Sequence, residues 1–170
     1  LKITVDTLEV TIPTVLGATS TVTVNGTAVT PTEGKITVPY NSKIVVTYTA
    51  ETGKHIVGDA SVTVESIEED NIDASSITTA VNVYTVAVTK VENTVVSVKI
   101  GDADPVVCTT DTVEVEHGKA FVATYTAAAG YKITSGTTEY TYSTVTQNFT
   151  EPYSTNIVVE EMTALEKLLA

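Results

Sequence analysis

Residues 44–56 read IVVTYTAETGKHI, and residues 121–133 repeat them as FVATYTAAAGYKI. This stretch decides the fold, because its register is fixed: Tyr48 and Gly53 recur at Tyr125 and Gly130, a constant spacing of 77 residues. A repeat of that length corresponds to one small domain rather than to one supersecondary unit. The chain of 170 residues is therefore predicted to be two domains in tandem.

Alternate residues of a strand point to opposite faces, which divides the repeated stretch into two sets. Ile44, Val46 and Tyr48 share one face of the first copy. The composition supports strands, since Val, Ile and Thr are abundant and β-branched residues pack well on a pleated surface. We expect the same face to form the core of each domain, with the second set being Phe121, Ala123 and Tyr125.

Turn-forming residues separate the predicted strands. Asn25 and Gly26 separate two runs of alternating residues, 21–24 and 27–30, which predicts a hairpin with a type I′ turn. Residues 98–100 lead into Gly101 in the second copy, one position out of register. Gly53 and Gly130 follow the repeated strand and are expected to adopt positive φ.

The domain boundaries follow from where the repeat starts and stops. Residues 84–88 align with residues 8–12, so domain one is predicted at 1–82 and domain two at 83–160. The acidic stretch 65–76 breaks the strand pattern and is expected to be a solvated loop, whereas strand character resumes at 80–83. Residues 161–170 favour a short amphipathic helix, whose apolar positions are Met162, Leu165, Leu168 and Leu169.

Charge excludes several classes of partner. Nine lysines and no arginine face 21 acidic residues, for a net charge of −12. Nucleic acids and anionic bilayers attract basic patches, and this sequence has none, so neither is expected as a partner. No apolar run is long enough for a membrane-spanning helix. The acidity is typical of a soluble, displayed protein.

The repeated element, a β-branched strand ending in Tyr-Thr-Ala-x-x-Gly-x-x-Ile, resembles the immunoglobulin-like repeats of bacterial surface proteins and tailed-phage virion proteins. The resemblance covers roughly residues 8–160 as two copies. It implies an all-β chain of two tandem immunoglobulin-like β-sandwich domains with a short C-terminal helix. It also implies a virion or cell-surface location and a role as a spacer, decoration or adhesion unit without an active site.

No catalytic, cofactor-binding or metal-binding residue is predicted. Cys108, the only cysteine, lies in a run that resembles a short strand and is expected to be a small buried apolar residue. His55 and His117 do not have zinc-ligand spacing with it. Calcium binding stays open for two acidic segments, 68–73 and 102–104, although neither has the spacing of a known calcium loop. An isopeptide bond of the kind that some adhesin sandwiches carry would involve Lys2, Lys90 or Asn148.

The function predicted from these observations is a non-enzymatic structural or decoration module of a phage virion or bacterial surface, with capsid or surface proteins as partners. The expected interface consists of the helix positions Met162, Leu165, Leu168 and Leu169 together with Tyr140 and Tyr142, which share one face of a strand. The alternative is a carbohydrate-binding or adhesin module whose tyrosines stack on sugars; these are Tyr131, Tyr140, Tyr142 and Tyr153. A homo-oligomer and a glycan stay open as partners.

Overall fold

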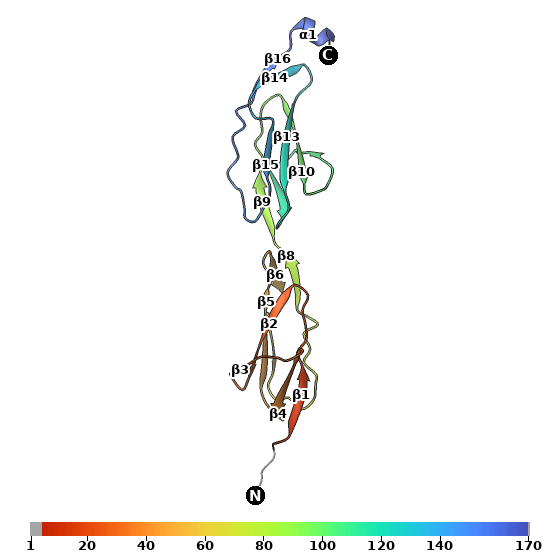
Figure 1. The fold of residues 1–170 in the computed structure, drawn as a ribbon. Coiled ribbons are helices and arrows are strands. Elements are labelled where there is room, and N and C mark those ends of the chain that lie inside the picture. Colours follow the sequence, from red (N-terminus) through yellow and green to blue (C-terminus); the bar gives the residue numbers. More distant parts are fainter. Residues whose placement is uncertain (1–4, 170) are drawn as a thin grey trace. The chain divides into compact units, whose positions relative to one another are not determined.

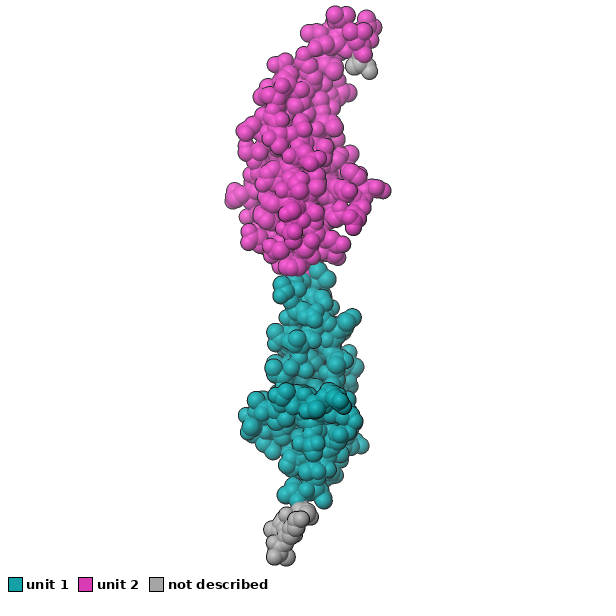
Figure 2. Space-filling model, viewed as in Figure 1, with its two compact units in different colours: residues 1–81 teal, residues 82–170 magenta. Residues whose placement is uncertain are grey.

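Alternating β-branched segments separated by turn residues form antiparallel strands along nearly the whole chain. The computed structural model describes residues 5–169 and divides into two compact units, residues 1–81 and 82–170 (Figure 2). Each unit is built from strands, and the described residues contain one short helix, α1 (Ala164–Leu169). The boundary falls one residue before the predicted one. The expectation of an all-β chain with a C-terminal helix is confirmed.

The described residues of unit 1 form eight strands. Figure 1 shows β1 and β4 side by side. A four-stranded sheet has the order β3-β2-β5-β7, and two further pairs are β1-β4 and β6-β8, all antiparallel. The strands are β1 (Thr7–Thr11), β2 (Ala18–Val24), β3 (Thr27–Val29), β4 (Lys35–Pro39), β5 (Ile44–Ala50), β6 (Lys54–Val57), β7 (Ser61–Val64) and β8 (Thr78–Val81).

Unit 2 repeats this order with a four-stranded sheet β11-β10-β13-β15 and the pairs β12-β9 and β14-β16. Its strands are β9 (Val83–Ala87), β10 (Thr94–Ile100), β11 (Val106–Val107), β12 (Thr112–Glu116), β13 (Phe121–Ala127), β14 (Tyr131–Ser135), β15 (Glu139–Tyr142) and β16 (Val158–Glu161). The closing ladders correspond: Lys54 of β6 pairs with Val81 of β8, and Tyr131 of β14 pairs with Glu161 of β16.

The predicted core face is confirmed in both units. Its members on β5 and β13 are almost completely buried. Each unit has one apolar cluster, to which both its four-stranded sheet and its β1-β4 or β9-β12 pair contribute. The core residues named from the sequence are Ile44, Val46, Tyr48, Phe121, Ala123 and Tyr125.

The tyrosine of the repeat also has a polar role. The Tyr48 hydroxyl donates a hydrogen bond to the carbonyl of Pro13 at 2.9 Å, and the Tyr125 hydroxyl donates one to the carbonyl of Thr89 at 2.7 Å. Both acceptors lie just beyond the first strand of their unit. In unit 2 the Tyr125 hydroxyl also lies 2.9 Å from the hydroxyl of Tyr153. The repeated tyrosine therefore fastens the long core strand to the segment that follows the first strand.

The predicted turns are present. Asn25 and Gly26 have φ values of 49° and 81° and connect β2 to β3, whose first pair is Val24 with Thr27, as a type I′ hairpin requires. Gly53 and Gly130 have φ values of 81° and 85°, which confirms the expectation of positive φ.

Three details differ from the sequence-based expectations. The acidic stretch 65–76 is not wholly solvated, because Ile67 is fully buried and the Asp70 carboxylate accepts hydrogen bonds from the backbone and hydroxyl of Thr11 at 2.8 Å. The strand expected at 80–83 is interrupted at Asn82: β8 ends at Val81 in unit 1, and β9 begins at Val83 in unit 2. Cys108 follows β11 rather than lying in it and is only half-buried, since the strand ends after two residues.

Candidate functional site

The C-terminal segment continues β16 into helix α1, which starts later than the predicted range 161–170. Glu161 remains in the ladder with β14, and the amide of Met162 donates to the carbonyl of Gly130 at 2.9 Å. Thr163 then caps the helix: its hydroxyl accepts from the amide of Glu166 at 3.3 Å, while the Glu166 carboxylate accepts from the amide of Thr163 at 2.8 Å. This reciprocal capping box fixes where the helix begins.

Two ion pairs hold α1 to the strands beneath it. Lys132 of β14 lies 2.6 Å from the Glu166 carboxylate, and Lys167 lies 2.8 Å from Glu161 of β16. The hydrogen bond from Lys132, reinforced by those from Thr163, lowers the pKa of Glu166 to about 2. The Lys167 hydrogen bond lowers the pKa of Glu161 as well. Both charged side chains of the helix are therefore paired with residues of β14 and β16.

The apolar side chains of the same helix face solvent. Leu165, Leu168 and Leu169, which we call the leucine stripe, are 66%, 81% and 79% exposed, and no residue of α1 is buried. Met162, just before the helix, is half-buried. An amphipathic helix that served only to complete its own domain would bury this stripe. Here the charged side is held against the domain, and the predicted interface leucines are left without cover among the described residues.

The predicted tyrosine pair packs onto unit 2. Tyr140 and Tyr142 share a face of β15, as expected, and their rings meet edge to face at 5.1 Å. Tyr140 stacks on Tyr153 at 3.9 Å, and Tyr142 stacks on Phe149 at 3.8 Å. Burial raises the pKa of Tyr142 to about 12. One face of each ring is thus covered by another aromatic side chain, and Tyr131 makes no contact with this group of rings.

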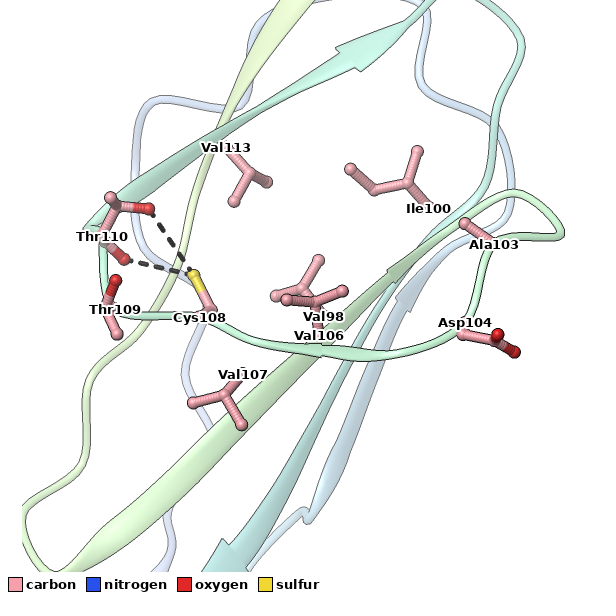
Figure 3. Close-up of a pocket in the computed structure, with 10 residues that line it drawn as sticks. All are labelled: Val98, Ile100, Ala103, Asp104, Val106, Val107, Cys108, Thr109, Thr110 and Val113. Carbon is pink, nitrogen blue, oxygen red and sulfur yellow. Dashed lines mark hydrogen bonds between the residues drawn. The ribbon is translucent and has the colours of Figure 1, made fainter.

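An apolar pocket of about 250 Å³ opens in unit 2 beside β11 (Figure 3). Cys108 lies at one end and Asp104 at the other, with valine side chains between them. Val106 and Val107 of β11 are largely exposed. The sequence did not predict this site, because its walls come from three strands and two loops. The lining residues are Val98, Ile100, Ala103, Asp104, Val106, Val107, Cys108, Thr109, Thr110 and Val113.

Unit 1 differs from unit 2 at the corresponding edge. Val29 pairs with Val22 as Val106 pairs with Val98, which makes residues 29–31 the counterparts of residues 106–108. These counterparts are Val-Thr-Pro in unit 1 and Val-Val-Cys in unit 2. The hollow beside β3 and β4 in unit 1 has polar walls that include Glu9, Glu33 and Lys35. The apolar pocket is therefore a feature of the second copy.

The other candidate groups have local structural partners. The Cys108 thiol lies 3.3 Å from the carbonyl of Thr110, and His117 lies 3.4 Å from the Tyr84 hydroxyl. Hydrogen bonds from Thr11 and from Ser75 lower the pKa values of Asp70 and Asp73, respectively. Between residues 5 and 169, no group of three or more histidine, cysteine or acidic side chains is placed to hold a metal ion.

The residues named for an isopeptide bond also have other partners. The Lys90 ammonium donates to the carbonyl of Cys108 at 2.6 Å, and the Asn148 side chain accepts from the amide of Thr85 at 2.8 Å. Lys2 lies outside the described residues. Within the described part of the chain, no helix is long and apolar enough to cross a membrane.

The spacing Thr163-x-x-Glu166 is the sequence signal of the capping box. The ion pair between Lys132 and Glu166 has no such signal, because these residues are 34 positions apart. No protein-family model matches this chain, and a search of curated proteins finds no match.

Proposed function

We propose that this protein is a structural module of a virion or a bacterial cell surface, built from two tandem immunoglobulin-like β-sandwiches and without a catalytic role. Its leucine stripe attaches it to a protein partner. One observation carries the proposal: α1 turns its charged side toward its own domain and its leucines toward solvent.

The energetics favour attachment through this helix. Burying an exposed leucine side chain contributes about 1.5–3 kcal/mol, so three leucines supply a useful driving force even after the cost of association. The capping box and the ion pairs order the helix before a partner arrives. Less conformational entropy is then lost on binding.

The remainder of the chain suits a spacer. Each unit repeats the same core strand, tyrosine hydrogen bond and turn glycine, which are features of folding and stability. A net charge of −12 keeps such a surface soluble. The alternative, a carbohydrate-binding module that uses Tyr140 and Tyr142, has less support, because Tyr153 and Phe149 each cover one face of these rings and leave at most the other face for a sugar.

Site-specific photo-crosslinking tests the proposal. A benzophenone amino acid replaces Leu168 in the protein made by its native producer, and cross-linked products are identified by mass spectrometry. We expect one dominant product with a structural virion or envelope protein, which can be a further copy of this chain. The control places the same group at Leu16, which is 93% exposed in a loop of unit 1. The same products from both positions, or none from Leu168, would contradict the proposal.

A further inference from the structure

We propose that the leucine stripe of one copy docks in the apolar pocket of unit 2 of a second copy. This inference rests on the proposed function, since it takes α1 as the attachment element, and it names both the partner and the surface that α1 contacts.

The two surfaces match in chemistry. The stripe presents only aliphatic side chains, and half of the residues that line the pocket beside β11 are valine or isoleucine. A cavity of about 150 Å³ already admits a benzene-sized molecule in other proteins, so a pocket of about 250 Å³ can take a leucine side chain. No residue between 5 and 169 covers either surface, so that pairing them removes both from water.

The difference between the repeats points to the same surface. Folding requires no apolar residue at the exposed position 107, because its counterpart in unit 1 is Thr30. An exposed apolar edge strand is usually avoided, since it invites association. Val106 is nevertheless 67% exposed and Val107 is 57% exposed on β11. The second copy of the repeat thus places a valine, Val107, at an exposed edge position where the first copy has Thr30.

Charge supports a contact between these surfaces despite the acidity of the chain. Lys90 flanks the pocket through its bond to the carbonyl of Cys108, and the Lys119 side chain lies against Gly101 at the adjacent turn. Neither lysine forms a salt bridge within residues 5–169. Glu160, two residues before Met162, forms none either. It lies opposite Lys132 on β14, whose pKa is raised by the hydrogen bond to Glu166 and also by the charge of Glu160. Docking brings these opposite charges closer, although Asp104 contributes one acidic group to the pocket wall.

The contact joins two different surfaces of the molecule, so it is heterologous. Each added copy brings a free stripe and a free pocket, and a contact of this kind extends a chain of molecules unless it closes into a ring. The area offered by three leucines is small, and interfaces below about 1,200 Å² are typically weak and transient. We therefore expect the copies to associate weakly and in a concentration-dependent manner, with the contact becoming effective where many copies are held in an ordered array.

Disulfide trapping tests the contact, with the native thiol in the pocket wall as the reporter. A copy carrying Leu168→Cys and Cys108→Ser is mixed with the wild-type chain under oxidised glutathione. We expect the mixed disulfide to form about tenfold faster than with a control copy carrying Leu16→Cys and Cys108→Ser, because docking raises the local thiol concentration toward the millimolar range. Both leucines are strongly exposed, so reactivity alone favours neither. Equal rates would overturn the inference.

Sedimentation equilibrium provides a second measurement. The wild-type chain is expected to self-associate as its concentration approaches about 1 mM, and Val106→Lys, a change that edge strands tolerate, is expected to abolish this association. A wild-type chain that stays monomeric, or a variant that associates equally well, would contradict the inference. The proposed function fails separately, through the photo-crosslinking at Leu168, because the stripe can bind another protein whether or not the pocket is used.

Discussion

Removing the hydroxyl of the repeated tyrosine tests how the two units are stabilised. In unit 1, Tyr48→Phe deletes one hydrogen bond, to the Pro13 carbonyl, and leaves the buried ring in place. A net loss of about 1 kcal/mol is expected, because one intramolecular hydrogen bond contributes about 0.5–1.5 kcal/mol. In unit 2, Tyr125→Phe deletes the bonds to Thr89 and Tyr153 and should cost about 2–3 kcal/mol.

For a domain of this size, each kcal/mol corresponds to roughly 4–8 °C in Tm. Differential scanning calorimetry measures the shift, and hydrogen exchange followed by mass spectrometry assigns it to residues 1–81 or 82–170. Tyr40→Phe is the matched control, because that ring is 46% exposed. If Tyr48→Phe shifts Tm no more than Tyr40→Phe does, or Tyr125→Phe costs less than Tyr48→Phe, the reasoning is wrong.

Three further perturbations give distinct outcomes. Phe121→Ala should destabilise unit 2 by about 3–5 kcal/mol and leave unit 1 unchanged, since Phe121 is fully buried in the unit 2 core; urea unfolding with exchange readout checks this. Gly26→Ala should cost only about 1–2 kcal/mol of backbone strain, because its added Cβ meets no atom within 4 Å. Gly136→Ala should prevent native packing, because its Cβ would overlap the Asn156 carbonyl oxygen; equal thermal stabilities of the two variants would contradict this. The pKa of Glu166 is lowered to about 2, so its stabilising contribution is complete above its unfolded pKa near 4.5 and is lost as pH falls toward 2. NMR chemical shifts of α1 should change over this pH range, and Lys132→Met should narrow the range by bringing the folded pKa of Glu166 closer to its unfolded value.

The features that the sequence predicted are local. Alternation around Tyr48 and Tyr125 specifies the core faces, and Asn25-Gly26 specifies a hairpin, because each depends on neighbouring residues alone. The burial of Ile67 was not predicted, because a single apolar residue in an acidic stretch creates no periodic hydrophobic pattern and its burial depends on residues distant in the sequence.

The candidate site was less accessible to prediction. Spacing identified the leucines of α1 but not which side of the helix would face the domain, since that depends on Lys132, far away in the sequence. The tyrosine pair shared a face as expected, yet stacking on Tyr153 and Phe149 depends on the path of the loop after β15. The pocket is lined by residues of β10, β11 and β12 and of the loops between them, and their arrangement is a tertiary property without a local pattern.

The matching closing ladders have a practical consequence for protein engineering. Glu161 pairs with β14 as Val81 pairs with β6, so Thr163 stands at the position that corresponds to Val83, the first residue of β9. The helix thus starts at the position that a further first strand would take. Inserting a second copy of residues 83–162 between Met162 and Thr163 would add one unit without a designed linker and would keep the leucine stripe directly after the added copy. Spacer length and attachment can then be varied independently.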